Sequence, residues 1–237
     1  MKKFLFKIIT ISILLICFFT NIYSYNVLGK MDNNQSENKI IYLTFDDGPS
    51  NITEDVLDVL NKYDVKATFF LIGNQIEGNE DIVKRINNEG HGIGLHSYTH
   101  NIKKIYSRNK YFIEEMLLTQ KKINEVIGVK PVILRFPGGS RNRLNKENLK
   151  LIHSNNFKIY DWNIDSKDGI NPKMSPNQIF KQATKIKDVE NPIILLMHCD
   201  YMHKNTCRAL PEIIKFYKNK GYEFKIIDEN TPEYYFK

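Results

Sequence analysis

Two adjacent carboxylates and a pair of spaced histidines are the residues of this chain best suited to chemistry. Asp46 and Asp47 directly follow an apolar segment, and neighbouring like charges raise each other's pKa unless a cation compensates them. His96 and His100 stand four residues apart, so both side chains would project the same way from one helical turn. Two imidazoles and one carboxylate, with a coordination position left open for water, are typical of catalytic zinc. The pattern predicts a divalent-metal site, although Asp-Gly-Pro is also ordinary turn chemistry and paired histidines are frequent on exposed helices.

A hydrolytic site of this kind also needs a base for the water, donors for the oxyanion and an acid for the leaving group. If Asp47 binds the metal, Asp46 is the natural base. His198 ends a very apolar segment and would on its own be interpreted as a core histidine, but as an imidazolium it can serve as the acid. That role needs a carboxylate to hold the ring charged and oriented, and Asp168 or Asp165 can supply it.

A cation and a flexible turn lie between these groups in the sequence. Arg135 stands at the end of an apolar segment and precedes Phe-Pro-Gly-Gly. Its guanidinium can pair with the Asp46 carboxylate. The backbone amides of Gly138 and Gly139 carry no side chain beside them and can approach an oxyanion. A surface arginine before an ordinary turn is the competing interpretation.

Seven short apolar runs have the composition of buried strands. They span residues 40–45, 67–72, 92–95, 132–136, 157–162, 193–197 and 222–227. Segments with helical spacing separate these runs, among them a first helix capped by Thr53 and a long helix that ends at Gly128. Further helices are expected after Asn145, Pro176 and Thr206. The alternation predicts an α/β fold with a parallel sheet, for which a barrel and a doubly wound sheet fit equally well.

The reactive groups fall at the carboxyl ends of the expected strands. In chain order they are Asp46 and Asp47 after the first strand, His96 after the third, Arg135 at the end of the fourth, Asp165 and Asp168 after the fifth, and His198 after the sixth. In parallel α/β folds these strand ends converge on one mouth, where active sites are built. His91 instead precedes a strand and His153 lies on an expected helix, so both are interpreted as surface or structural.

The N-terminus is expected to direct export rather than to belong to the fold. Residues 1–25 combine three lysines with an apolar run over 8–19, the pattern of a signal peptide or an N-terminal membrane anchor. Residues 26–39 are polar without periodicity and predict a flexible tether to one catalytic domain over 40–237. Beyond the three leader lysines, 31 basic residues face 27 acidic ones, and this surplus of four charges gives no sign of a nucleic-acid partner. Cys199 and Cys207 can form a disulfide in an oxidising exterior or remain separate thiols, and both interpretations stay open.

Five motifs in order make the chain similar to the polysaccharide deacetylases of carbohydrate esterase family four, which are related to the rhizobial chitooligosaccharide deacetylase. The similarity covers roughly residues 40–227. The motifs are residues 44–49 (TFDDGP), 96–100 (HSYTH), 135–139 (RFPGG), 161–168 (DWNIDSKD) and 196–198 (LMH).

The resemblance implies a distorted (β/α)7 barrel with parallel strands, which agrees with the seven expected strands. It implies one divalent metal ion, usually zinc and in some members cobalt or nickel, bound by Asp47, His96 and His100. The roles that it implies for other residues are Asp46 as base with Arg135 as its partner, His198 as acid with Asp168 as its carboxylate, the Gly138 amide in the oxyanion site, and Trp162 and Leu196 as the wall around the acetyl methyl. Asp165 is expected among the substrate contacts.

Two positions depart from the family pattern. Gly138 stands where a tyrosine is common, and Gly169 stands where a tryptophan usually follows the aspartate of the fourth motif. Both losses predict a more open substrate groove.

The motifs and the export segment together predict an extracellular monomeric hydrolase, secreted or anchored, that removes N-acetyl groups from N-acetylglucosamine units of peptidoglycan and releases acetate. The alternative substrates are N-acetylmuramic acid, poly-N-acetylglucosamine, chitooligosaccharides and acetylxylan. An alternative from another class is an inactive carbohydrate-binding module on the same fold. Such a module could lose its metal ligands, its base or its acid, and the complete set in this sequence argues against it. A zinc phosphodiesterase is a weaker alternative, because its two-metal site would usually need more carboxylate and histidine ligands than this sequence offers.

Overall fold

The computed structural model describes residues 39–187 and 189–236, which form one α/β unit around a single sheet. The strands are β1 (Ile40–Gly48), β2 (Thr68–Leu71), β3 (Gly92–Leu95), β4 (Ile133–Leu134), β5 (Lys158–Ile159), β6 (Ile164–Asp165), β7 (Ile193–His198) and β8 (Glu223–Lys225). The helices are α2 (Asn51–Lys62), α3 (Glu80–Asn88), α4 (Ile102–Ile105), α5 (Asn109–Ile127), α6 (Lys146–Ser154), α7 (Pro176–Ala183) and α8 (Lys204–Asn219). The predicted export segment and all of the tether except Lys39 lie outside the described residues.

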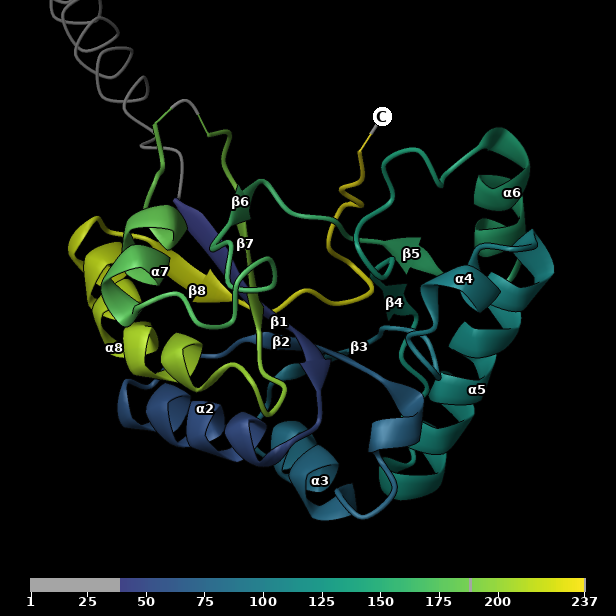
Figure 1. The fold of residues 1–237 in the computed structure, drawn as a ribbon, viewed down its shortest axis with the longest axis horizontal. Helices are drawn as coiled ribbons and strands as arrows, with labels where there is room; N and C mark the ends of the chain where they lie inside the picture. The colour runs from purple at the N-terminus through teal and green to yellow at the C-terminus, as the bar shows by residue number, and fades with distance from the viewer. Residues whose placement is uncertain (1–38, 188, 237) are drawn as a thin grey trace, which may run out of the picture. The chain divides into compact units, whose positions relative to one another are not determined.

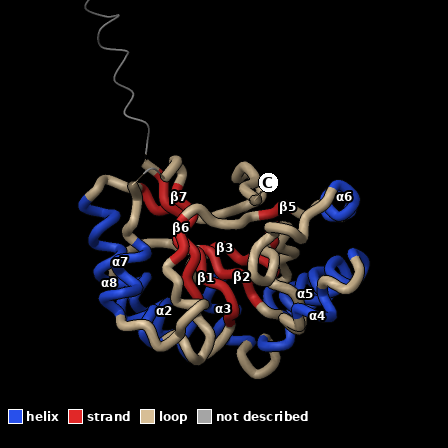
Figure 2. Tube along the Cα trace, turned by 45° about the horizontal axis from the view of Figure 1, so that its top comes forward, coloured by secondary structure: helices blue, strands red, loops and turns tan. Residues whose placement is uncertain are grey.

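The strands form a curled half-barrel of parallel strands, which confirms the predicted distorted (β/α)7 architecture. The strand order is β5-β4-β3-β2-β1-β7-β6, and β8 pairs with the first residues of β1 beside this path. The helices lie on the outside of the curled sheet, with α2, α7 and α8 on one side and α5 on the other (Figure 1, Figure 2). In the part of the chain that the structure describes, no helix is both long and apolar enough to cross a membrane.

Burial on both faces explains why the central strands are apolar almost throughout. Within β1, every residue from Ile41 to Asp46 is buried, and β7 is buried from Ile193 to Met197. A strand that is covered by helices on one face and by the barrel interior on the other has no exposed side for polar residues. The polar residues of β1 therefore stand out at its carboxyl end.

Some predicted boundaries differ from the structure. Ser50, not Thr53, is the N-cap of α2; Thr53 is the third helical residue and completes a capping box with Ser50. The expected strand over 157–162 is only β5, and the two-residue strand β6 was not predicted because it is too short to leave a periodic pattern. Seven strands were predicted, and seven lie in the continuous path of the sheet. This path includes β6, which was not predicted, while the predicted strand over 222–227 is β8, which pairs with β1 beside the path.

Candidate active site

Asp47, His96 and His100 bring three metal-ligand atoms together at the carboxyl ends of β1 and β3. Oδ1 of Asp47 lies 3.4 Å from Nε2 of His96 and 3.4 Å from Nε2 of His100. This Oδ1 is buried and has no hydrogen-bond partner among the described residues, which is costly unless a cation lies beside it. The three donor atoms therefore fit a divalent ion, as the sequence predicted.

The tautomer of His96 also suits a metal ligand. Its Nδ1 lies 3.0 Å from the backbone carbonyl oxygen of Arg135, which can only accept, so Nδ1 carries the proton and Nε2 keeps a lone pair. Burial lowers the pKa of His96 from its usual value, even though Asp46 and Asp47 act in the opposite direction. A neutral imidazole with a free Nε2 is the form that binds a metal.

The two histidines come from a loop and not from the predicted helical turn. Residues 96–101 have no helical structure, and Ser97 and His100 have φ values of 67° and 53°. Asp47 also has a left-handed φ of 67°. Such values are uncommon for residues other than glycine, and their clustering at ligand positions indicates that the fold constrains the backbone there.

Glu115, which the sequence analysis missed, anchors this loop from α5. Its buried carboxylate oxygen Oε2 accepts hydrogen bonds from the backbone N–H of Tyr98 and Thr99 at 3.0 and 2.6 Å, and from the Thr99 hydroxyl at 2.9 Å. Lys104 pairs with the other oxygen at 3.1 Å. A carboxylate between the buried residues Phe112 and Met116 was the signal in the sequence, because a charge on the apolar face of a helix needs partners.

Asp46 and Arg135 form a buried ion pair next to the ligand cluster. Nη1 of Arg135 donates to Oδ1 of Asp46 at 2.9 Å and to the Thr44 hydroxyl at 2.7 Å. Nε and Nη2 donate to the backbone carbonyls of Tyr160 and Asp161 at 2.8 and 3.0 Å. The guanidinium, which is fully buried, is thus bound on all its sides and fixes the Asp46 carboxylate, whose Oδ2 lies 3.7 Å from His96 Nε2.

His198 and Asp168 form the second ion pair of the site. Nδ1 of His198 lies 2.8 Å from Oδ1 of Asp168, whose other oxygen accepts from the His198 backbone N–H and the Thr206 hydroxyl. Burial alone would lower the pKa of His198, but the hydrogen bond and negative charge of Asp168 raise it to about 9. Burial would likewise raise the pKa of Asp168, yet His198 holds it down at about 2. The pair is therefore an imidazolium and a carboxylate at neutral pH.

Asp165 is not the partner of His198. Its carboxylate pairs instead with the Lys167 ammonium at 2.9 Å and accepts from the Lys167 backbone N–H at 2.7 Å. It still lies on the wall of the site, where it can contact a substrate.

A second imidazole, His203, was also missed. Its ring stacks on that of His198 with centroids 5.1 Å apart, and its Nδ1 lies 2.8 Å from Oδ1 of Asp200. Its Nε2 is buried without a hydrogen-bond partner among the described residues. The sequence signal was an aspartate and a histidine three residues apart directly after β7.

His203, His198 and Asp168 could by spacing also hold a metal ion. Oδ1 of Asp168, however, already accepts from His198, from the Ser166 hydroxyl and from the Gly169 backbone N–H. The ligand atoms around Asp47 carry no such hydrogen bonds, so that cluster fits an ion better. This difference disfavours the two-metal arrangement of a phosphodiesterase.

The site opens onto one cavity of about 410 Å³. Asp46, Asp47, His96, His100 and His198 line it. Gly138, Trp162 and Leu196, which were predicted to contact the substrate, line it as well. The Gly138 backbone N–H takes part in none of the hydrogen bonds within the described residues, so this donor is available to a ligand.

The two glycines that depart from the family pattern do not simply leave open space. A Cβ at Gly138 would lie 2.7 Å from Nη1 of Arg143, whose guanidinium packs over the Tyr106 ring and donates to the Pro137 carbonyl. A Cβ at Gly169 would lie 2.8 Å from Nε2 of His198. Arg143 therefore occupies the space that a side chain at position 138 would need, and Gly169 is required for close packing of the His198 ring. A more open groove stays a prediction.

The remaining sequence predictions lie away from the cavity. Cys199 and Cys207 are both free thiols, which decides the open question of a disulfide in favour of separate thiols. His91 is structural, since it is buried and its Nδ1 accepts from the Ala67 backbone N–H at 3.2 Å. His153 is at the surface and pairs with Glu233 at 3.0 Å.

Comparison with known proteins gives the family of a chain with this site. The sequence profile described as polysaccharide deacetylase matches residues 33–158. The chain belongs to the polysaccharide deacetylase family. It is a hydrolase of this family, and its Asp-His-His cluster is the divalent-metal site that the chemistry of the family requires.

Individual relatives agree with this assignment. The deacetylase is 40% identical over 206 residues to a peptidoglycan-N-acetylglucosamine deacetylase of Bacillus cereus, with 84% of this chain and 72% of that protein covered. It is 34% identical over 196 residues to YheN of Bacillus subtilis, described as a putative polysaccharide deacetylase, with 81% and 68% covered. The crystal structure of the polysaccharide deacetylase Bc1974 from Bacillus cereus superposes with a TM-score of 0.76 at 40% identity, covering 82% of this chain and 95% of that one.

Proposed function

We propose that this deacetylase removes the N-acetyl group from N-acetylglucosamine units of peptidoglycan, outside the cell membrane. The observation that carries the proposal is that the ligand cluster, the Asp46 carboxylate, which pairs with Arg135, and the His198 ring, which pairs with Asp168, all line one cavity. The name of the Bacillus cereus relative supports the glycan. The basic and then apolar N-terminus supports an extracellular location, either secreted or anchored. One copy of the chain holds the complete set, which supports an active monomer.

The metal ion, which we propose is zinc, would be held by Asp47, His96 and His100 and supplies Lewis-acid chemistry to the reaction. Asp46 acts as the base that takes a proton from the attacking water. Arg135 holds this carboxylate in place at the cavity through the 2.9 Å hydrogen bond. Thr44 fixes the guanidinium in turn, because its hydroxyl accepts from Arg135 and donates to the Leu195 carbonyl.

The remaining groups act on the substrate amide. The free backbone N–H of Gly138 donates to the oxyanion as the carbonyl becomes tetrahedral. Trp162 and Leu196 offer an apolar wall for the acetyl methyl group. His198, charged through its contact with Asp168, gives its proton to the departing nitrogen, so acetate and a free amine are the products.

The proposal is tested by measuring acetate release from purified peptidoglycan with the full chain. We expect release that stops with a chelator and returns when zinc is added back. Release that is unaffected by chelation contradicts the proposed mechanism, and no release from peptidoglycan together with release from acetylxylan contradicts the proposed substrate.

The His198–Asp168 pair predicts the alkaline limb of the pH profile. His198 must be protonated to act as the acid, so kcat/KM falls as the pH rises through its raised pKa. In Asp168→Asn the burial that lowers this pKa remains while the charge that raises it is lost, so the alkaline limb moves to lower pH. His153→Gln, at the surface, serves as the control. An unchanged alkaline limb in Asp168→Asn would show that His198 is not the titrating acid.

Gly169→Ala tests the close packing at His198. The added methyl would overlap the imidazole, which must move while Asp168 still holds its Nδ1. Misplacement of a catalytic group by about 1 Å costs roughly 100-fold in rate. We expect kcat to fall by about that factor while the melting temperature changes little, since Gly169 is exposed and its φ is ordinary. Wild-type kcat in Gly169→Ala would show that the ring position is not critical.

A further inference from the structure

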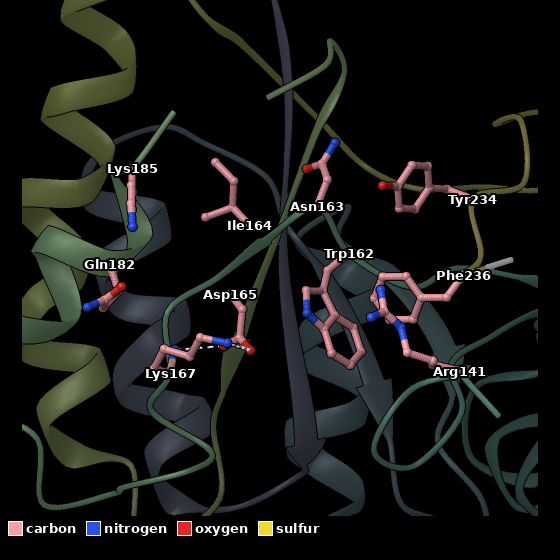
Figure 3. Close-up of a pocket in the computed structure, with 10 residues that line it drawn as sticks. All are labelled: Arg141, Trp162, Asn163, Ile164, Asp165, Lys167, Gln182, Lys185, Tyr234 and Phe236. Atoms are coloured by element: carbon pink, nitrogen blue, oxygen red, sulfur yellow. Dashed lines mark hydrogen bonds and ion pairs between the residues drawn. The ribbon is translucent and has the colours of Figure 1, made fainter. Parts of the chain in front are cut away.

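A second hollow lies directly beside the cavity, with Trp162 and Asp165 lining both. Its volume is about 490 Å³, within the range of roughly 300–1,000 Å³ typical of small-molecule sites. Figure 3 shows Trp162 at its centre, Arg141 and Phe236 on one side, and on the other side Gln182 from α7 and Lys185, which follows the end of α7. No part of the chemistry described above uses this hollow.

The charge of the hollow is opposite to that of the cavity. Arg141, Lys167 and Lys185 line the hollow against the single carboxylate of Asp165, which leaves a surplus of two positive charges. The cavity, by contrast, is lined by four carboxylates and by no lysine or arginine, so it keeps one net negative charge even with the His198 imidazolium and a divalent ion at Asp47, His96 and His100. A ligand that spans both would therefore place a neutral group in the cavity and an anionic group in the hollow.

Two of the three cations are available to a ligand. Lys167 is already paired with Asp165 at 2.9 Å. The side chains of Arg141 and Lys185 form no ion pair or hydrogen bond with the described residues. The guanidinium of Arg141 instead packs over the Phe236 ring, 4.9 Å from its centroid, which leaves its N–H groups free to bind a carboxylate.

The aromatic side of the hollow is firmly held. Phe236 meets Trp162 edge-on with centroids 5.2 Å apart. The Phe236 backbone N–H donates to Oδ2 of Asp161 at 2.8 Å, and Oδ1 of this fully buried aspartate accepts from the Ser140 backbone N–H at 3.0 Å. The same residues thus fix the C-terminal segment and the turn that carries Arg141. Apolar ring faces next to free cations suit a sugar that bears a carboxylate.

We propose that this hollow is a subsite for the neighbouring sugar of the glycan and that Arg141 and Lys185 bind its carboxylate. The inference rests on the proposed function and extends it to the sugar next to the one that is deacetylated. The group bound is the carboxylate of the lactyl ether that distinguishes the alternating sugar of peptidoglycan. A carboxylate of an attached stem peptide offers the same chemistry, and the experiment separates the two sources.

The test compares three substrates of equal sugar length with the full chain. They are a neutral N-acetylglucosamine tetramer, a peptidoglycan tetrasaccharide with free lactyl carboxylates, and the same tetrasaccharide with stem peptides. The variant Arg141→Gln/Lys185→Gln is compared with Arg108→Gln/Lys181→Gln. The control pair removes the same charge from exposed residues that do not line the hollow, and Arg108 also packs over an aromatic ring, that of Tyr111.

The measured quantity is the ratio of kcat/KM for an anionic substrate to kcat/KM for the neutral tetramer. We expect Arg141→Gln/Lys185→Gln to lower this ratio about tenfold for the free lactyl tetrasaccharide, because charge-assisted hydrogen bonds contribute at least that factor. The control pair should leave the ratio within about twofold, a limit set by the small effect of screened surface charges. A fall only with the peptide-bearing substrate supports the carboxylate subsite and assigns the charge to the stem peptide. An unchanged ratio for both anionic substrates overturns the proposal.

Binding can be followed without catalysis, so the two proposals can fail separately. Trp162 is the only tryptophan of the chain and lines the hollow, so its fluorescence reports a bound sugar. If no substrate releases acetate, the proposed function fails. The subsite is then still decided by whether the lactyl tetrasaccharide binds about tenfold more weakly to Arg141→Gln/Lys185→Gln than to the wild type, a factor again set by charge-assisted hydrogen bonds.

Discussion

Asp46→Asn is expected to lower kcat for acetate release by a factor of about 10² to 10⁴, the range over which a positioned general base accelerates a reaction. The amide cannot take a proton from water, but it has nearly the same shape as the carboxylate. It can still accept the hydrogen bond that Nη1 of Arg135 now donates to Oδ1 at 2.9 Å. The loss should therefore appear in kcat and much less in KM.

The experiment needs saturating metal, because residues next to metal ligands can change metal affinity by 10- to 100-fold. Asp81→Asn is the matched control: it makes the same chemical change on an aspartate whose side chain is 93% exposed. We expect its kcat to equal that of the wild type. If Asp46→Asn keeps more than about a tenth of the wild-type kcat, well above the range for loss of a base, Asp46 is not the base.

Arg135→Met is expected to have the largest effect on stability. It removes a fully buried guanidinium and leaves the Asp46 carboxylate, which is also buried, without its counter-charge. Breaking a buried pair in this way typically costs about 3–5 kcal/mol. The free energy of unfolding, measured by denaturant titration of the chelated protein, should fall by about that amount.

The double variant Arg135→Met/Asp46→Asn tests whether the charge is responsible for this loss. It removes both partners, so it should be more stable than the sum of the two single changes predicts, by about 0.5–3 kcal/mol. Additive losses would indicate that Arg135 stabilises the fold through the carbonyls of Tyr160 and Asp161 alone.

The sequence predicted those parts of the site that depend on strand ends. Asp46, Arg135 and His198 were expected to meet because parallel strands bring their carboxyl ends to one mouth. In the structure Asp46 and His198 lie near the ends of β1 and β7 and line the cavity, and Arg135 directly follows β4 and is bound to Asp46. The ligand set Asp47, His96 and His100 was also predicted, because the five motifs in order are specific together, although the helical turn expected for the two histidines is a loop. The fold followed from the alternation of strands and helices together with the five motifs.

Features that depend on tertiary packing could not be predicted in the same way. Glu115 acts through backbone amides seventeen and sixteen residues away from it, so no local pattern identifies it as a loop anchor. His203 reaches His198 because the loop after β7 folds back, and Phe236 reaches Trp162 because the chain end pairs with the segment between β5 and β6. The space beside Gly138 was expected to be open because a sequence cannot show that Arg143 fills it.

The position of the free amine in treated peptidoglycan tests the central claim most directly. Purified peptidoglycan is incubated with the full chain and zinc, digested to disaccharides and analysed by mass spectrometry, with acetate measured in parallel. The account predicts one new amine for each acetate released, located on the glucosamine residue and absent when a chelator is present. Amines on muramic acid, or acetate released without any new amine, would contradict it.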